Sequence, residues 1–215
     1  MHGESSRGRR IVLWRHGQTA WNREQRFQGT TDIGLNAAGV EEARRAATAL
    51  AALTPDAIIT SDLKRAAATA ERLSALVRLP AVPKTGLREA YTGRWQGLTH
   101  QEIVNKYGEE YAAWKRGEPV RRGGGELDTE VAERAVPIVE RYAERLPEHG
   151  TLVVVSHGGT IRATVGRLLG LRPSKWLSLG GLSNCRWHVL SQESSGWRLS
   201  VRNTGAPQEA EFGEG

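Results

Sequence analysis

The sequence predicts an α/β protein, a three-layer α/β/α sandwich with a mostly parallel central sheet. Short continuous apolar runs, such as Ile11–Trp14 and Thr151–Val155, are typical of strands that are covered on both faces, as in a parallel sheet. Segments with helical spacing follow these runs, and alternating strands and helices favour right-handed crossovers with helices on both faces of the sheet. We therefore expect a single domain over residues 10–203.

The first predicted strand, Ile11–Trp14, is followed by a helix that begins after Asn36, a residue suited to the N-cap. This helix extends to about Leu53, and a second strand follows at Ala57–Ile59. The next helix is predicted from about Asp62 to Val77. Apolar residues of the first helix recur at helical spacing and should share its buried face: Val40, Ala43, Ala47 and Leu50.

Residues 91–127 are rich in glycine, tryptophan and charge, and we interpret them as a small lid insertion. Within them, Thr99 and Glu102 have the spacing of a capping box and predict the start of a helix that carries Ile103 and Val104.

The last predicted elements begin with a long helix from about Asp128 to Leu146, in which Pro137 should cause a kink or a break. A further helix covers about Thr160–Leu169 and ends before Gly170, which suits the C′ position. The final pair of strands is predicted as a hairpin, Asn184–Leu190 with Trp197–Arg202.

Residues 1–9 and 204–215 are polar and aperiodic, and we predict that both are disordered tails. No stretch approaches 18 consecutive apolar residues, so we expect no membrane partner, and the N-terminus lacks the apolar stretch of a signal peptide. A single cysteine, Cys185, suits a small buried residue in a reducing compartment, so we expect a cytoplasmic protein.

The net charge of +6 does not indicate a nucleic-acid partner, because the lysines and arginines are dispersed along the chain. Excess positive charge fits an anionic small-molecule substrate equally well. No cluster has metal-ligand spacing, so we expect neither a metal nor another cofactor. Four histidines show no partner pattern and are expected on the surface or in packing: His2, His100, His149 and His188.

Two predicted strands end in the same dipeptide, His16-Gly17 and His157-Gly158. In open α/β sheets, ligands bind outside the carboxyl ends of the strands. Either histidine alone is compatible with an ordinary loop residue. The matching positions of the pair, with Arg15 beside the first, favour a shared anion site.

Arg65 falls in the first turn of the helix predicted from Asp62. A cation is unfavourable at a helix N-terminus unless an anion lies nearby, and the N-terminus itself attracts phosphate. The alternative for Arg65 is a surface salt bridge.

Together these motifs resemble the histidine phosphatase superfamily, the phosphoglycerate mutase-like group. The resemblance covers about residues 10–190 and depends on four elements in the right order: Arg15-His16-Gly-Gln-Thr19 with Asn22, Ser61-Asp-Leu-Lys-Arg65-Ala with Thr69, then Glu89, and Ser156-His157-Gly158.

The resemblance implies that His16 is a nucleophile that becomes phosphorylated and that Glu89 gives a proton to the leaving oxygen. The residues that it implies for binding the phosphoryl group are Arg15, Arg65 and His157, and the further substrate-binding positions are Asn22, Gln28 and Gly158.

Elementary chemistry agrees with these roles. Arginine side chains can each hold two oxygens of a phosphoryl group in transfer, and they favour the neutral form that a nucleophilic His16 needs. Glu89 must be protonated as an acid and ionised as a base, so a raised pKa would help it. Without the resemblance, Glu89 is equally compatible with a plain surface charge.

The superfamily contains phosphatases and cofactor-dependent phosphoglycerate mutases. Mutases carry a larger insertion after the position of Glu89, whereas the Gly93-x-Trp95-x-Gly97 pattern here is similar to phosphatase members. Arg121 and Arg122 could still serve as the paired arginines of a mutase, which keeps that alternative open. A catalytically silent module that binds phosphorylated ligands is a further alternative, but every expected catalytic position is filled.

The segment Trp176–Trp187 is similar to the C-terminal region of the actinobacterial glucosyl-3-phosphoglycerate phosphatases, a group within the superfamily. This similarity implies a small sugar-phosphate or phosphoglycerate-type substrate. A broad-specificity phosphatase is the alternative, and a homodimer is left open. We expect Trp21, Trp95 and Trp114 to be pocket walls, and at least two of Trp14, Trp187 and Trp197 to be packing residues.

Overall fold

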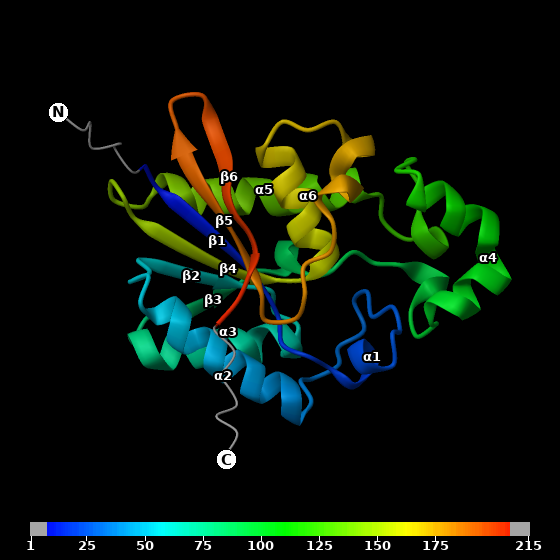
Figure 1. The fold of residues 1–215 in the computed structure, drawn as a ribbon, viewed down its shortest axis with the longest axis horizontal. Helices are drawn as coiled ribbons and strands as arrows, with labels where there is room; N and C mark the ends of the chain where they lie inside the picture. Colours follow the sequence, from blue (N-terminus) through cyan, green and yellow to red (C-terminus); the bar gives the residue numbers. More distant parts are fainter. Residues whose placement is uncertain (1–7, 207–215) are drawn as a thin grey trace, which may run out of the picture.

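A six-stranded sheet forms the centre of the computed structural model, which describes residues 8–206 (Figure 1). The strand order is β3-β2-β4-β1-β5-β6. The first four strands in this order are parallel, whereas β5 is antiparallel to β1 and β6 is antiparallel to β5. The strands are β1 Arg10–Arg15, β2 Ala57–Thr60, β3 Ala81–Pro83, β4 Thr151–Ser156, β5 Trp187–Glu193 and β6 Gly196–Thr204.

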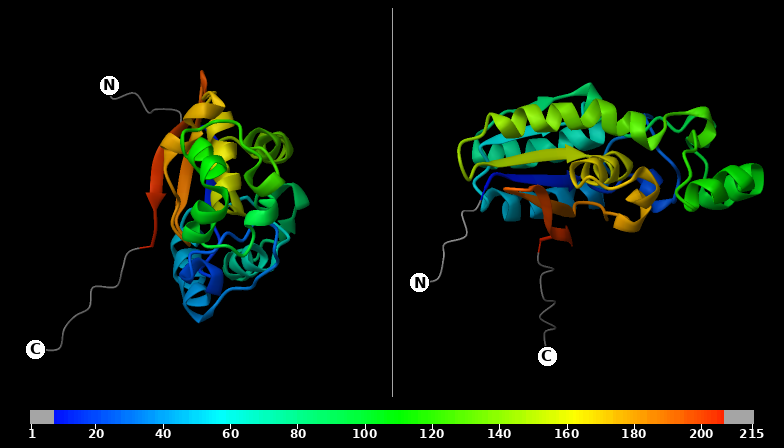
Figure 2. Two further views of the ribbon diagram at one scale, coloured as in Figure 1. Left: turned by 90° about the vertical axis from the view of Figure 1, so that its right-hand side faces the viewer. Right: turned by 90° about the horizontal axis from the view of Figure 1, so that it is seen from above.

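Helices cover both faces of the sheet, which confirms the predicted three-layer α/β/α class (Figures 1 and 2). Helices α2 and α3 pack on one face, and α5 and α6 pack on the other. The α-helices are α1 Ala20–Arg23, α2 Ala37–Ala51, α3 Lys64–Val77, α4 His100–Lys115, α5 Asp128–Glu144 and α6 Gly158–Leu168. The 3₁₀ turns are η1 Thr85–Leu87, η2 Gly93–Trp95, η3 Arg122–Gly124 and η4 Pro173–Leu179.

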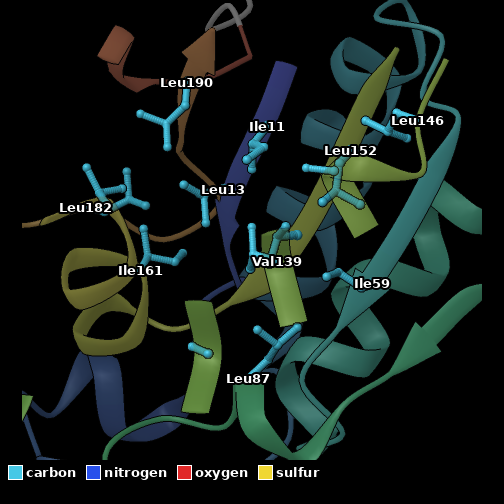
Figure 3. Close-up of a cluster of buried hydrophobic side chains, with 14 residues drawn as sticks. Ile11, Leu13, Ile59, Leu87, Val139, Leu146, Leu152, Ile161, Leu182 and Leu190 are labelled. Atoms are coloured by element: carbon cyan, nitrogen blue, oxygen red, sulfur yellow. The ribbon is translucent and has the colours of Figure 1, made fainter. Parts of the chain in front are cut away.

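Strand β1 shows why the apolar runs are continuous. Successive side chains of a strand point to opposite faces, so Ile11 and Leu13 contact the layer of α5 and α6, while Val12 and Trp14 contact the layer of α2 and α3. Figure 3 shows the first of these clusters, in which sheet residues face Val139 of α5 and Ile161 of α6. Because both faces are buried, no polar alternation is needed, as the sequence predicted.

The predicted helix starts are confirmed where capping residues define them. The Oδ1 of Asn36 accepts a hydrogen bond of 2.8 Å from the backbone N–H of Gly39, and Thr99 and Glu102 form the predicted capping box of α4. One side-chain prediction is wrong: Val40, expected on the buried face of α2, is 39% exposed. The buried face of α2 does contain the other three predicted residues, Ala43, Ala47 and Leu50.

The predicted break at Pro137 does not occur, because α5 continues as one helix through this residue. Pro137 is exposed, whereas Val136 and Val139 beside it are buried against neighbouring elements, and this packing offsets the lost hydrogen bond. Helix α6 begins at Gly158, two residues before the predicted start, and Gly170 beyond its end has a positive φ of 66°, as expected at C′.

The C-terminal hairpin is confirmed as β5 and β6, but its first strand begins at Trp187 rather than Asn184. Asn184 and Cys185 form a turn instead, because the Nδ2 of Asn184 donates a hydrogen bond of 3.0 Å to the carbonyl of His16. Strand β3 was not predicted, since its three residues include Pro83 and show no clear pattern.

The chain ends of the structure extend the predicted boundaries of the domain. The carbonyl of Arg9 accepts a hydrogen bond of 2.9 Å from the N–H of Gln192, and β6 includes Thr204. Of the two predicted tails, residues 1–7 and 207–215 lie outside the described residues. Across residues 8–206, none of the helices combines the length and apolar character that crossing a bilayer requires.

Candidate active site

The two His-Gly turns lie side by side at the carboxyl edge of the sheet. Strands β1 and β4 are adjacent and parallel, with Arg15 in register with Ser156, so that His16 and His157 follow at the same level. The backbone N–H of His16 donates a hydrogen bond of 3.0 Å to the carbonyl of Ser156. The two imidazole rings are 5.1 Å apart between centroids. The predicted juxtaposition of the two histidines is therefore present.

The turn after His16 fixes which ring nitrogen faces the cavity. The Nδ1 of His16 is 2.7 Å from the carbonyl oxygen of Gly17, and a carbonyl can only accept, so Nδ1 carries the proton. Nε2 therefore keeps its lone pair. Gly17 is required at this turn, because a Cβ there would overlap the carbonyl of Gly39 in α2.

His16 is held in its neutral form. Burial lowers the pKa of His16 well below its ordinary value, and the neighbouring His157, Arg65 and Arg15 lower the pKa further. A neutral imidazole with a free Nε2 is the form in which histidine acts as a nucleophile.

His157 is fully buried, and its ring is hydrogen-bonded on both sides. Its Nδ1 accepts a hydrogen bond of 3.2 Å from the Nε of Arg65, so Nε2 carries the proton and donates to the Oγ of Ser61 at 2.8 Å. Burial and the charges of Arg65 and Arg15 lower the pKa of His157 well below its ordinary value. Both ring nitrogens thus have protein partners, and the contact of His157 with the phosphoryl group stays a prediction.

Arg65 is fully buried in the first turn of α3, as predicted, and it is not a surface salt bridge. Besides His157, its guanidinium donates to the carbonyls of Thr31 and Gly29, each at 2.8 Å. Arginine has five N–H groups, so two remain for a ligand. Burial lowers the pKa of Arg65 to about 10, which leaves it a cation at neutral pH.

Arg15 faces the cavity from the end of β1. Its Nη1 donates a hydrogen bond of 2.5 Å to the carbonyl of Leu182, whereas its buried Nε has no partner among the described residues. Burial lowers the pKa of Arg15, while the carboxylate of Glu89 raises it. Two guanidinium groups, Arg15 and Arg65, therefore flank His16 with unused N–H groups.

Glu89 is half-buried at the N-terminus of α6. Its carboxylate accepts hydrogen bonds of 3.0 Å from the backbone N–H groups of Gly159 and Thr160 and one of 2.9 Å from that of Ala90. Gly159 permits this contact, because a Cβ there would lie 2.6 Å from the Oε1 of Glu89.

The pKa of Glu89 lies below its ordinary value, contrary to the raised pKa that the sequence led us to expect. Burial raises the pKa, but the hydrogen bonds from Gly159 and Ala90 and the charges of Arg122 and Arg65 outweigh burial. With this lowered pKa, Glu89 is a carboxylate at neutral pH. A bound dianion would weaken the field of the arginines and raise this pKa.

The three predicted substrate-binding residues also line the cavity: Asn22, Gln28 and Gly158. The Oδ1 of Asn22 accepts from the backbone N–H of Thr19 and from the Nδ2 of Asn184, which orients the side chain at the start of α1. Gln28 is buried, and its Oε1 has no partner among the described residues. Seven of the eight predicted site residues thus meet at one cavity of about 360 Å³, and the eighth, His157, contacts one of them, Arg65.

The 91–127 segment forms the outer wall of this cavity. It contributes Thr92, His100, Trp114 and Arg122. Of the tryptophans expected as pocket walls, only Trp114 has this position. Trp95 is instead fully buried in an aromatic cluster with Phe27 and Trp114, and Trp21 does not line the cavity.

His100 and Arg162 are among the wall residues that sequence reasoning missed. His100 was expected on the surface or in packing, but it lines the cavity and its Nδ1 is 3.1 Å from the hydroxyl of Tyr111. Arg162 follows His157 by five residues, within α6, and no local pattern marked it. The only sequence signal was its distance of one helical turn from Gly158.

Unpartnered polar atoms concentrate at this cavity. Eight buried side-chain nitrogen or oxygen atoms of the described residues lack a hydrogen-bond partner, and six of them belong to residues that line the cavity. Buried polar groups are almost always paired, so this concentration indicates a polar ligand. The six residues are Arg15, Gln28, Thr92, Trp114, Arg122 and Arg162.

The arrangement is suited to transferring a phosphoryl group to nitrogen. A neutral imidazole lone pair lies between two arginines whose free N–H groups can hold the equatorial oxygens of a phosphoryl group. A carboxyl group lies within the same cavity to serve the leaving oxygen. Among residues 8–206, no group of three or more histidine, cysteine, aspartate or glutamate side chains is placed to hold a metal ion.

Comparison with known proteins matches residues 11–205 to the family model of the histidine phosphatase superfamily, branch 1. The glucosyl-3-phosphoglycerate phosphatase of Mycobacterium tuberculosis is 38% identical over 93% of this chain and 96% of its own. A metal-independent phosphoserine phosphatase of Arabidopsis thaliana is 34% identical over 87% of this chain and 78% of its own. The structure of a mycobacterial glucosyl-3-phosphoglycerate phosphatase complexed with VO3 superimposes with a TM-score of 0.87, at 39% identity over 92% of this chain and 100% of the other.

Proposed function

The chain belongs to branch 1 of the histidine phosphatase superfamily and is a phosphomonoester hydrolase, and we propose that it acts through a phosphohistidine at His16. The observation that carries this proposal is the orientation of the His16 ring. Its Nδ1 is held by the carbonyl of Gly17, and its free Nε2 belongs to a cavity shared with Arg15 and Arg65.

In the first step the Nε2 of His16 attacks phosphorus, and the bond between phosphorus and the leaving oxygen breaks. Arg15 and Arg65 bind the phosphoryl oxygens, and further donors are the amide group of Asn22, the amide group of Gln28 and the backbone N–H of Gly158. Glu89, protonated once the phosphate dianion is bound, gives its proton to the leaving oxygen, and the alcohol departs.

In the second step a water molecule attacks the phosphorus of the phosphohistidine. Glu89, now a carboxylate, takes a proton from this water, and the bond between phosphorus and Nε2 breaks. Inorganic phosphate is released, and His16 returns to its neutral form. Splitting the transfer in this way replaces one difficult displacement by two easier ones.

We propose a phosphoglycerate-type or small sugar-phosphate substrate such as glucosyl-3-phosphoglycerate. Support comes from the relatives of that name, which this chain matches over nearly its whole length. A cavity of about 360 Å³ is large enough for a small sugar phosphate. We further propose that the enzyme acts in the cytoplasm, where its single cysteine stays reduced, and that its partner is this small molecule.

A phosphate-release assay without added metal tests the proposal over a matched set of esters. The set contains glucosyl-3-phosphoglycerate, 3-phosphoglycerate, phosphoserine, glycerol 3-phosphate and nucleoside monophosphates. We expect release of inorganic phosphate, with the highest kcat/KM on a phosphoglycerate ester. Interconversion of 3- and 2-phosphoglycerate without phosphate release would identify a mutase instead, and preferred hydrolysis of nucleotides would contradict the substrate proposal.

A further inference from the structure

Two arginines of the cavity wall belong to a charged cluster that the hydrolytic steps do not use. Asp128, the first residue of α5, lies between two arginines: its Oδ1 is 2.5 Å from the Nη2 of Arg122, and its Oδ2 is 3.6 Å from the Nη2 of Arg162. The guanidinium of Arg122 also lies 5.5 Å from the ring centroid of Trp114. Both arginines line the cavity.

Arg162 is a largely buried cation without a complete set of partners. Its side chain is 14% exposed, and its Nη2 has no hydrogen-bond acceptor among the described residues, since the ion pair with Asp128 is longer than a hydrogen bond. The Nε of Arg122 is likewise buried without a partner. Burying an arginine in this way is costly unless a ligand supplies the missing acceptor.

Arg162 is also placed next to the reacting end of the cavity. It lies one turn after Gly158 in α6, and side chains of a helix lean toward its N-terminus, where Glu89 is bound. The charge of Glu89 acts on Arg162, and the charge of Arg122 acts on Glu89. Because Arg162 and Glu89 line the same cavity, one small ligand can contact both.

The balance of charge indicates what this cluster binds. A phosphate ester dianion neutralises Arg15 and Arg65, and Glu89 is uncharged when it acts as the acid. Arg122 and Arg162 with Asp128 then retain one positive charge. Arg26, the remaining arginine of the wall, is already paired with Glu24 and Glu102. One further negative charge, on the leaving group of the substrate, would neutralise the remaining positive charge of the site. A second phosphate group would add more negative charge than the site can neutralise.

We propose that Arg162, positioned with Arg122 by Asp128, binds a carboxylate on the leaving group and so makes the enzyme selective for phosphomonoesters of hydroxy acids. This inference rests on the proposed function and adds to it a specificity-determining residue. The Asp128 carboxylate holds the two guanidinium groups together, and the substrate carboxylate accepts the N–H groups that they leave unused.

The test compares 3-phosphoglycerate with glycerol 3-phosphate, which differ only in a carboxylate against a hydroxymethyl group. In Arg162→Met, kcat/KM for 3-phosphoglycerate should fall about 10- to 100-fold, mainly through KM, as expected for a lost charged hydrogen bond. Glycerol 3-phosphate should be hydrolysed within about twofold of wild type, since uniform binding to its phosphoryl group is retained. Arg162→Lys should restore part of the selectivity, because it restores the charge.

Arg167→Met is the matched control, because Arg167 belongs to the same helix, lies outside the cavity and is exposed. This variant should leave unchanged the ratio of kcat/KM for 3-phosphoglycerate to kcat/KM for glycerol 3-phosphate. Equal losses on both substrates in Arg162→Met, or no loss on 3-phosphoglycerate, would overturn the inference while phosphatase activity stands.

Inhibition by D-glycerate of p-nitrophenyl phosphate hydrolysis separates this inference from the proposed substrate. D-glycerate carries the carboxylate without a phosphoryl group, so its inhibition constant reports the subsite without turnover of a phosphoglycerate. We expect weaker inhibition in Arg162→Met. If wild type hydrolyses no phosphoglycerate ester but glycerate inhibits it through Arg162, the substrate proposal fails and the subsite stands. An inhibition constant of D-glycerate that is the same in wild type and in Arg162→Met would contradict the carboxylate subsite.

Discussion

The Nε of Arg65 donates a hydrogen bond of 3.2 Å to the Nδ1 of His157, so the second histidine of the site holds an arginine rather than facing the cavity. Ser61 fixes the other side of the ring by accepting from Nε2. We therefore propose that His157 is a positioning residue, and its neutral form is the one that can accept from Arg65. This relationship separates the roles of two histidines that look equivalent in sequence.

Substituting His157 tests this division of roles. His157→Ala should lower kcat/KM by about 100-fold, the scale expected when one preorganised donor to the phosphoryl group is lost. Inhibition by inorganic phosphate should weaken in parallel, because Arg65 loses its orientation. His157→Gln, whose side-chain oxygen can accept from Arg65, should recover part of both. A variant that loses activity but binds phosphate normally would contradict a positioning role.

Glu89→Gln tests the proton donor. With an alkyl phosphate, whose leaving oxygen needs a proton, kcat should fall about 10²–10⁴-fold, the usual contribution of general acid–base catalysis. With p-nitrophenyl phosphate, whose leaving group departs as a stable anion, formation of phosphohistidine should be slowed far less. The measurement is the burst of p-nitrophenol compared with single-turnover rates on glycerol 3-phosphate. An equal loss of rate with both esters would contradict the role of Glu89 as the general acid.

The buried histidines predict how stability depends on pH. His16, His157 and His188 have pKa values below the ordinary value, and that of His188 is lowered to about 4 by burial and by Arg202. The folded protein therefore keeps them neutral while the unfolded chain binds protons below about pH 6.5, so stability is present above that pH and is lost as pH falls.

His188 alone should account for a loss of about 2 kcal/mol between pH 7.5 and pH 5.0. Urea unfolding at the two pH values measures this loss, and His188→Asn should reduce the difference by that amount. His149→Asn is the control, because His149 is exposed and its positive φ of 66° suits asparagine. A stability that is flat from pH 7.5 to 5.0 would contradict the buried neutral histidines.

The aromatic cluster around Trp95 predicts a local effect on the 91–127 segment. Trp95 is fully buried against Phe27 and Trp114, and Trp→Ala changes in such sites cost about 3–5 kcal/mol. In Trp95→Ala, hydrogen exchange should accelerate across this segment and KM should rise, while β1 and β4 stay protected. Equal acceleration of hydrogen exchange in the sheet strands would show that the effect of Trp95 is not confined to residues 91–127.

Most of the fold could be predicted from the sequence because local signals and packing agree. The runs Ile11–Trp14 and Thr151–Val155 are continuous since both faces of the sheet are covered. Asn36 and Thr99 mark helix starts by chemistry that acts over three residues. The prediction of a break at Pro137 was wrong, because packing on the buried side of α5 outweighs the free-energy cost of a proline within the helix.

The inner part of the site was readable for a related reason, since His16 and His157 follow strands whose ends must meet in a parallel sheet. The outer part was not. His100 and Arg162 reach the cavity only through the packing of α4 and α6, which no short pattern encodes. The pKa of Glu89 depends on the N–H of Gly159 and on the charges of Arg122 and Arg65, which are distant in sequence, as well as on the N–H of Ala90, so its direction was predicted wrongly.

The central claim is that the Nε2 of His16 bonds to phosphorus. Rapid quenching of wild type with radiolabelled substrate should trap close to one acid-labile, base-stable phosphoryl group per chain, and peptide mapping should place it on His16. His149→Asn should give the same yield and His16→Ala none, with its fold retained. Phosphate release by His16→Ala at the wild-type rate, or a label on another residue, would contradict the account.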